Sequence, residues 1–451
     1  MPEPIISVSG LRGLIGESLT PEVAARFAAA FAGTLPAGSV VITRDGRNTG
    51  EMLAAAVAAA LTACGKHVLD AGISATPTTG VLVREHKCVG GIQISASHNP
   101  PEYNGLKLFS GAGRVIPAAP GEAVLAAYRA GQFPWVKYDR IGRIEKLNDT
   151  TSAHLKLVLG RVNVAEVRRH KFRVLLDSNH GAGSILGKLL LAELGCEVIG
   201  VGDAPDGNFA HPPEPTAENL ATITSRVRAE KCVVGFCQDP DADRLAVIDE
   251  QGRYIGEEYT LAICLDHVLR RTPGPVVTNC ATSRMSQDLA EKYGVPFLRS
   301  AVGEANVVDG MLSQNAVFGG EGNGGPIDPA VGLVRDSFIG MALLLEALAT
   351  RAVPVSQLAN ELPRYEIHKD KVTLAKESVP AAMETLIAKF PEASVSRLDG
   401  LRLDWPKQWL IVRASNTEPI VRIIAEAATL AAAKQLCTSA AEILLQGSVK
   451  I

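Results

Sequence analysis

The sequence lacks the charge imbalance of proteins that bind nucleic acid or anionic membranes. Its 451 residues include 45 Lys and Arg against 48 Asp and Glu, for a formal net charge of -3, and the pI is near 6.3. Either polyanionic partner would require a strong basic excess. We therefore expect a small molecule as the partner, with no nucleic acid and no membrane.

Long apolar runs and a leader-like beginning are also lacking. No stretch approaches the roughly 18 uninterrupted apolar residues of a membrane-spanning helix. The first residues, MPEPIISVSGLRG, show no basic segment followed by an apolar one. The expected location is the cytoplasm.

Cysteines are few and do not form a metal-binding pattern. Of the eight, Cys232 and Cys237 are the closest pair, and no second pair completes a zinc site. Free cysteines are among the residues most often buried. We expect all eight to be small buried hydrophobic residues.

What is present is the composition of a globular protein, with 47% hydrophobic and 21% charged residues. The length suggests two to four domains. Apolar runs alternate with Ala- and Leu-rich helical stretches, which predicts an α/β fold with mostly parallel sheets. We expect three similar α/β domains in series and a smaller carboxyl-terminal α+β domain, with the bounds 1–148, 149–253, 254–366 and 367–451.

The first candidate site is the segment SASHNPPEYNGLK, residues 95–107, which follows the apolar strand GGIQI. Ser, Asn and Pro together form a rigid turn that can present one hydroxyl, here that of Ser97, to a ligand. From its composition alone the segment is either a solvated turn or the site of a nucleophile.

The second candidate is DPDADR, in which Asp239, Asp241 and Asp243 occupy alternate positions after the run VVGFCQ. Three carboxylates so close repel one another unless a cation neutralises them, and a hard divalent ion suits oxygen ligands. The twelve-residue EF-hand pattern is absent. A solvated acidic turn is the alternative.

The third candidate is the glycine-rich segment 319–325, GGEGNGG. Its glycines leave the backbone open to a ligand, and Glu321 and Asn323 can bind sugar hydroxyls. The spacing of a dinucleotide or Walker phosphate loop is missing. A flexible link is the alternative.

The fourth candidate is RASNTEP, residues 413–419, followed by Arg422. A guanidinium beside short polar side chains and backbone N–H groups can bind an oxyanion, with phosphate the expected ligand. As an isolated segment it could equally be a turn without function.

Taken in order, the four segments resemble the phosphoserine, metal, sugar and phosphate loops of the α-D-phosphohexomutase family, and the resemblance covers nearly the whole chain. It implies an isomerase that interconverts hexose 6-phosphate and hexose 1-phosphate through a hexose 1,6-bisphosphate. Serine esters and positioned cations suit phosphoryl transfer, because its transition state carries spread-out negative charge.

The resemblance also implies a role for each residue. Ser97 would carry the phosphoryl group, and an oxygen of that phosphate would bind Mg2+ together with Asp239, Asp241 and Asp243. Lys107 and Arg12, the latter in a GLRG segment, would support proton transfer and transition-state charge. Substrate would be bound by Arg244 beside the reacting phosphate, by Glu321 and Asn323 at the sugar, and by Arg413, Ser415, Asn416, Thr417 and Arg422 at the other phosphate.

The sugar loop departs from the family pattern. Many members have Ser and His where this chain has Asn323 and Gly325, so the second proton-transfer group falls to Lys107 and His98. The GEGNGG form resembles a subset assigned to glucosamine phosphate, which makes that sugar the leading substrate and mannose or glucose phosphate the alternative. An amine at carbon 2 favours a nearby carboxylate, which the sequence does not place. A phosphoserine-dependent sugar phosphatase and a non-catalytic sugar-phosphate sensor are alternatives of other classes, and the oligomeric state is open.

Overall fold

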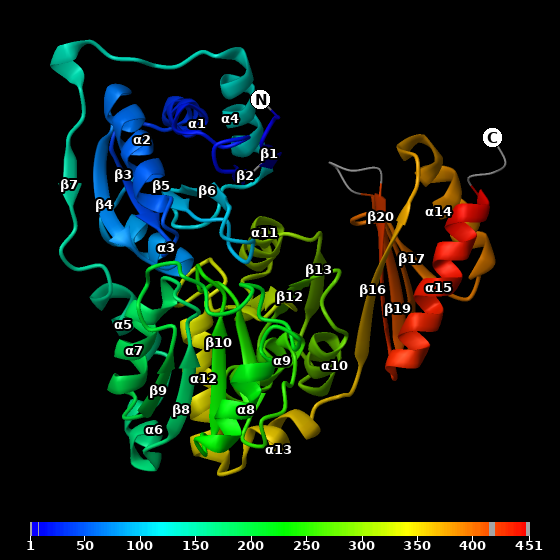
Figure 1. The fold of residues 1–451 in the computed structure, drawn as a ribbon. Helices are drawn as coiled ribbons and strands as arrows, with labels where there is room; N and C mark the ends of the chain where they lie inside the picture. The colour runs from blue at the N-terminus through cyan, green and yellow to red at the C-terminus, as the bar shows by residue number, and fades with distance from the viewer. Residues whose placement is uncertain (1, 8, 415–419, 448–451) are drawn as a thin grey trace.

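The computed structural model describes residues 2–7, 9–414 and 420–447, which form four successive units with one sheet each (Figure 1). Three α/β units come first, and a smaller α+β unit follows at the carboxyl end. This arrangement confirms the predicted fold class. The boundaries given above stay predictions.

The first unit has a seven-stranded mixed sheet. Its elements are β1 (Ile5–Ser7), β2 (Gly10–Leu14), α1 (Pro21–Thr34), β3 (Ser39–Arg44), α2 (Gly50–Ala63), β4 (His67–Ile73), α3 (Thr76–Glu85), β5 (Gly90–Ile94), β6 (Tyr103–Ser110), α4 (Ala118–Ala130), η1 (Tyr138–Arg140) and β7 (Ile144–Lys146). The order is β1-β2-β6-β5-β3-β4-β7, with β3, β4 and β5 parallel. Every residue of β5 is buried, as expected for a parallel strand covered on both faces.

The second unit has a four-stranded sheet in which only the last strand is antiparallel. Its elements are α5 (Ser152–Leu159), α6 (Val164–His170), β8 (Arg173–Asp177), α7 (Gly183–Glu193), β9 (Glu197–Val201), α8 (Ala221–Ala229), β10 (Val234–Gln238) and β11 (Leu245–Asp249). The order is β11-β10-β8-β9, so β10 lies inside the sheet.

The third unit repeats this plan. Its elements are α9 (Glu257–Arg271), β12 (Val276–Asn279), α10 (Met285–Lys292), β13 (Phe297–Ser300), α11 (Glu304–Gln314), β14 (Phe318–Glu321), β15 (Gly325–Ile327), α12 (Ser337–Arg351) and α13 (Val355–Asn360). The order is β13-β12-β14-β15. Helix α12 is buried from Ser337 to Ala349 and shares one hydrophobic core with the second unit, which fixes these two units to each other.

The fourth unit has a five-stranded antiparallel sheet covered by helices on one face (Figure 1). Its elements are β16 (Glu366–Thr373), η2 (Lys376–Ser378), α14 (Val379–Lys389), β17 (Ser394–Ser396), β18 (Leu401–Trp405), β19 (Gln408–Ala414), β20 (Ile420–Ala427) and α15 (Leu430–Gly447). The order is β16-β20-β19-β18-β17.

Polar contacts tie the fourth unit to the third. The backbone N–H of Arg284 donates to Glu426 at 2.9 Å, and that of Val302 donates to Asp399 at 2.9 Å. The buried guanidinium of Arg402 donates to the carbonyl of Cys280. These contacts fix the sheet of the fourth unit against the third unit.

The cysteine prediction is correct for seven residues and wrong for one. Cys196 is only partly buried, because it directly precedes the edge strand β9, whose residues are all exposed or half-buried. The other seven cysteines are buried. Among the described residues, no helix is long and apolar enough to cross a membrane.

Candidate active site

Ser97 lies in the turn between β5 and β6, past the end of a buried parallel strand. Its φ of +50° falls in the left-handed region that serine seldom adopts. The N–H of Ser97 donates to Oγ of Ser95 at 2.9 Å, and Ser95 donates to the buried carboxylate of Asp45 at 2.6 Å. These side chains hold the strained backbone that presents the Ser97 hydroxyl.

Arg47 fixes the same turn through its guanidinium group. Its side chain is buried against Asp45 at 3.1 Å, and it donates to the carbonyl oxygens of Ser97 (2.7 Å), Asn99 (2.6 Å), Pro100 (2.7 Å) and Tyr103 (2.9 Å). Sequence analysis missed both Arg47 and Asp45. A signal was available, since both follow β3, and the ends of neighbouring parallel strands share one edge of the sheet.

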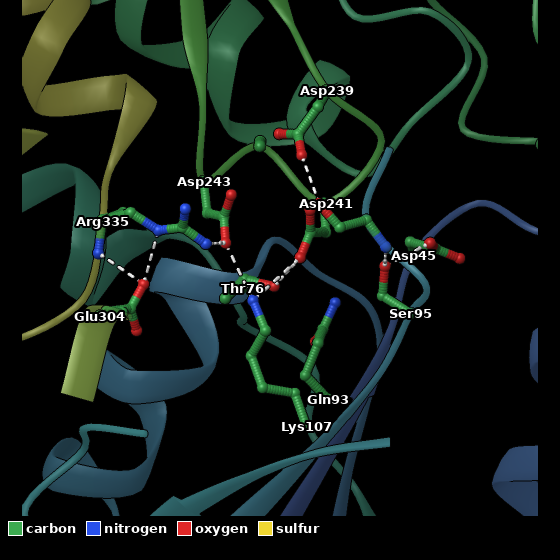
Figure 2. Close-up of polar contacts among 12 residues, drawn as sticks. Asp45, Thr76, Gln93, Ser95, Lys107, Asp239, Asp241, Asp243, Glu304 and Arg335 are labelled. Atoms are coloured by element: carbon green, nitrogen blue, oxygen red, sulfur yellow. Dashed lines mark hydrogen bonds and ion pairs between the residues drawn. The ribbon is translucent and has the colours of Figure 1, made fainter. Parts of the chain in front are cut away.

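The acidic triad of Asp239, Asp241 and Asp243 lies in the turn between β10 and β11, and all three residues are fully buried (Figure 2). One ligand atom from each lies within 4.8 Å of the others. Oγ of Ser97 donates to Oδ2 of Asp239 at 2.8 Å. The hydroxyl of the first unit therefore touches the acidic turn of the second.

Burial and mutual repulsion make Asp239 costly to ionise, whereas nearby cations favour the ionised form of Asp243. Burial raises the pKa of Asp239 well above its usual range, and Asp241 and Asp243 raise it further. Burial acts on Asp243 in the same direction, but Arg335 and Lys107 outweigh it and hold the pKa of Asp243 below its usual range. Oδ1 of Asp241 and Oδ1 of Asp243 are buried and have no hydrogen-bond partner among the described residues. Three hard oxygen donors, two with an unpartnered atom, fit a small divalent cation.

Lys107, on β6, extends to this triad. Its Nζ lies 2.9 Å from Oδ2 of Asp243 and 3.4 Å from Oδ2 of Asp241. Burial lowers the pKa of Lys107, but the two carboxylates outweigh that effect and hold the pKa above its usual range. The protonated ammonium supplies positive charge and a donor, and it is poorly suited to accept a proton.

Arg335 joins the acidic triad to the sugar loop. Its guanidinium lies 2.6 Å from Asp243, 2.9 Å from Glu304 and 2.9 Å from Glu321; Figure 2 shows the first two pairs. The side chain is buried, so these ion pairs are shielded from water. Sequence analysis missed Arg335 and Glu304, because neither lies in a segment whose composition is unusual.

The sugar loop is the turn between β14 and β15. Oε1 of Glu321 accepts from Asn279 at 2.7 Å and from the N–H of Gly303 at 3.0 Å, while Oε2 accepts from Arg335. Glu321 is thus fixed in position by three donors. Oδ1 of Asn323 is buried and, within the described part of the chain, has no hydrogen-bond partner, so it can accept from a ligand hydroxyl.

Arg12, His98 and Arg244 lie around Ser97. Arg12 lies on β2, opposite Gly105 of β6. Nδ1 of His98 is 3.3 Å from Oγ of Ser97, and the N–H of Arg244 donates to Asp239 at 3.1 Å. Burial, Arg244 and Arg12 lower the pKa of His98 to about 3, so its imidazole is neutral near pH 7.

The fourth unit carries a row of cations. Arg422 on β20 lies directly opposite Arg413 on β19 and Lys371 on β16. Like charges in direct cross-strand pairs repel, so the row favours a bound anion. Arg413 is also paired with Asp399 at 2.8 Å. The predicted residues Ser415, Asn416 and Thr417 lie outside the described residues.

A cavity of about 660 Å³ opens among all four units. That volume is within the range of small-molecule sites. The predicted residues that line it are Arg12, Lys107, Arg244, Glu321, Asn323 and Arg422. Ser97 lines an adjoining hollow of about 110 Å³, and Arg12 and Lys107 line both this hollow and the larger cavity. Two other predicted residues, Arg413 and His98, are not among the described residues that line either space. Sequence analysis missed Glu258 and Lys369, which also line the large cavity.

The fold and the site together are those of an enzyme with a cation-lined cavity beside an acidic triad that could hold a metal ion. Four models of phosphoglucomutase/phosphomannomutase domains match the chain in order: α/β/α domain I at residues 5–135, domain II at 152–252, domain III at 257–365 and the C-terminal domain at 370–443. The chain therefore belongs to the phosphoglucomutase/phosphomannomutase family of isomerases.

Named relatives agree with this assignment. The chain is 36% identical over 431 residues to a phosphoglucomutase/phosphomannomutase of Thermococcus kodakarensis, covering 93% of each chain. It is 34% identical over 442 residues to a probable phosphoglucosamine mutase of Thermococcus gammatolerans, covering 97% of each. A crystal structure of a phosphoglucomutase/phosphomannomutase family protein from Burkholderia thailandensis superimposes with a TM-score of 0.86, at 27% identity and 98% coverage of each chain.

Proposed function

We propose that this protein interconverts glucosamine 6-phosphate and glucosamine 1-phosphate, with Ser97 as the phosphoryl carrier. The observation that carries the proposal is the 2.8 Å hydrogen bond from Ser97 to Asp239 in the buried triad. Glucosamine phosphate leads because of the GEGNGG loop and the name of the Thermococcus gammatolerans relative. The name of the Thermococcus kodakarensis relative favours mannose or glucose phosphate as the alternative.

Asp239, Asp241 and Asp243 would hold Mg2+, together with an oxygen of the phosphate on Ser97. The two unpartnered carboxylate oxygens and the raised pKa of Asp239 support this assignment. Bound there, the ion supplies positive charge that stabilises the transferring phosphoryl group. Residues of the chain carry out the remaining steps.

In the first transfer the bond between phosphorus and Oγ of Ser97 breaks as a sugar hydroxyl oxygen bonds to phosphorus. The product is hexose 1,6-bisphosphate, and the hydroxyl proton must leave while Ser97 regains one. Lys107 and Arg12 line both cavities, so we assign them the charge of the transition state. His98, 3.3 Å from Oγ of Ser97, is the group we assign to the proton on the serine.

The second transfer returns the other phosphate to Ser97, so the bisphosphate must turn end for end. Cations on both sides of the cavity suit this requirement. Arg244 and Lys107 come from the first two units, and Arg422 comes from the fourth, with Arg413 beside it. Glu321 and Asn323 would bind hydroxyls that both orientations share. We keep the cytoplasm as the expected location.

The test compares kcat/KM for glucosamine 6-phosphate, mannose 1-phosphate and glucose 1-phosphate, with Mg2+ and catalytic hexose 1,6-bisphosphate present. We expect turnover of all three, with the highest value for glucosamine 6-phosphate. Release of free phosphate without isomerisation would indicate a hydrolase. Binding without turnover would indicate a sensor, and either result would overturn the proposal.

A further inference from the structure

Three carboxylates line the large cavity among the described residues: Glu258, Glu304 and Glu321. All three come from the third unit. The cations in the same lining come mostly from the other units, with Arg12, Lys107 and Arg244 from the first two and Lys369 and Arg422 from the fourth. A hexose with phosphates at its two ends would therefore meet cations at its ends and these carboxylates along its ring.

Two of the three carboxylates form ion pairs within the protein. Glu304 and Glu321 each lie 2.9 Å from the guanidinium of Arg335. Glu321 also accepts from Asn279 and from the N–H of Gly303. Both carboxylates therefore already have a basic partner in the protein, which they share with Asp243.

Glu258 is different, because no ion pair joins it to any residue in the described part of the chain. It lies in the first turn of α9, and its Oε2 accepts one hydrogen bond, 2.9 Å long, from the N–H of Ser283. Lys369 acts on it electrostatically but forms no ion pair with it in the described part of the chain. Among the residues that the structure describes, no hydrogen-bond donor to Oε1 is found.

Glu258 also lies directly against the sugar loop. A Cβ added at Gly322 would lie 2.0 Å from Oε1 and 2.1 Å from Oε2 of Glu258. A side chain at position 322 would therefore displace the carboxylate. Gly322 separates Glu321 from Asn323, so Glu258 lies beside the two residues assigned to the sugar hydroxyls.

We propose that Glu258 binds an ammonium group on the hexose ring and so makes 2-amino sugar phosphates the preferred substrates. This inference rests on the proposed function and specifies its substrate class. A carboxylate discriminates in this way because an ammonium offers both charge and N–H donors, whereas the hydroxyl of mannose or glucose offers a donor without charge.

The electrostatic surroundings of Glu258 agree with such a role. Burial chiefly raises the pKa of Glu258 to about 8, against the opposing effect of the Ser283 N–H, while Glu426 and Glu257 add repulsion and Lys369 opposes it. A ligand that brings a positive charge relieves this cost, and a neutral sugar does not.

The test is the Glu258→Gln variant, assayed as intact enzyme with Mg2+ and hexose 1,6-bisphosphate. The amide keeps the size of the side chain and an oxygen for the Ser283 N–H. We expect kcat/KM for glucosamine 6-phosphate to fall roughly 10- to 150-fold relative to that for mannose 1-phosphate, as for the loss of a charge-assisted hydrogen bond. Most of the change should appear in KM.

The matched control is Glu257→Gln, which removes the same charge one position earlier on α9. Glu257 lines a neighbouring pocket but not the large cavity. We expect the substrate ratio to be unchanged in this variant. An unchanged ratio in Glu258→Gln, or an equal loss for both sugars, would overturn the inference.

These outcomes separate the inference from the function on which it rests. A wild-type enzyme that prefers glucosamine 6-phosphate, together with a Glu258→Gln variant that keeps the same substrate ratio, overturns only the role of Glu258. Absence of isomerisation with every hexose phosphate overturns the proposed function itself. Circular dichroism and thermal unfolding of each variant establish that the fold is intact.

Discussion

The hydroxyl of Ser97 donates a 2.8 Å hydrogen bond to the carboxylate of Asp239 across the contact between the first and second units. Ser97 is partly exposed, whereas Asp239 is fully buried. A ligand can therefore reach the serine oxygen, while the carboxylate stays protected from water. This geometry supports the proposal that Ser97 carries the phosphoryl group next to a cation held by the triad.

Ser97→Ala should abolish phosphoenzyme formation and nearly all isomerisation, because the oxygen that carries the phosphoryl group is removed. The loss of its single hydrogen bond to Asp239 should change the free energy of unfolding by about 1 kcal/mol. Intact mass spectrometry measures the phosphoenzyme, and a coupled assay measures turnover. Ser110→Ala, at the far end of β6, is the control and should keep both. Near-normal isomerisation in Ser97→Ala would contradict the mechanism.

Asp239→Asn should abolish the stabilisation that Mg2+ gives to the wild type. A ligand that binds only the folded state raises Tm, and this variant removes one ligand and one negative charge. In EDTA the variant should be at least as stable as the wild type, because it relieves the repulsion that raises the pKa of Asp239. Thermal unfolding with and without Mg2+ measures both effects. An equal rise in Tm for the two proteins would count against the triad as the metal site.

The sequence predicts the parts of this site that are contiguous in the chain. Ser97 and the aspartates stand out because each loop follows an apolar strand and has an unusual composition for its length. Other site residues do not stand out in the sequence, because their importance comes from partners far away along the chain. These residues are Asp45, Arg47, Arg335 and Glu258. Arg47, for example, is an ordinary residue after β3 until the sheet order places β3 beside β5. The four-unit fold is easier to predict, since the alternation of strand and helix patterns is local.

Arg47→Met should destabilise the protein and impair catalysis together. Four carbonyl oxygens of the Ser97 turn would lose their donor, and the buried Asp45 would lose its counter-ion. Removing one partner of a buried ion pair typically costs about 3 to 5 kcal/mol. Urea unfolding measures the cost, and the rate of phosphoenzyme formation reports on the turn. Arg44→Met, at the end of β3 and only partly buried, is the control. A variant as stable and as fast as this control would show that the turn does not depend on Arg47.

Arg422→Ala should raise KM for the sugar phosphate by about 10- to 150-fold, the effect of one charge-assisted hydrogen bond to phosphate. Arg422 suits this test better than Arg413, because Arg413 also holds Asp399, which accepts from the N–H of Val302. Loss of Arg422 also relieves its repulsion with Arg413 and Lys371, so the ligand-free protein should not lose stability. Arg397→Ala, in the same unit and exposed, is the control. An unchanged KM would remove Arg422 from the phosphate site.

The stability of the ligand-free protein should depend on pH through Glu258. Burial raises the pKa of this carboxyl to about 8 from a usual value of 4.5, so the folded state retains a proton that the unfolded state has lost. Between these two values the unfolded state binds fewer protons, and stability must fall as pH rises. Subtracting the Tm of Glu258→Gln from that of the wild type separates this contribution from the titration of Glu257, Glu426 and Lys369, which act on the same carboxyl. As pH rises towards 8, we expect the Tm of the wild type to fall steadily relative to that of Glu258→Gln. Above that pH the difference should level off. If the difference stays constant over that range, Glu258 is already ionised in the empty site, and the stabilisation expected from a substrate ammonium must come from Coulomb attraction alone.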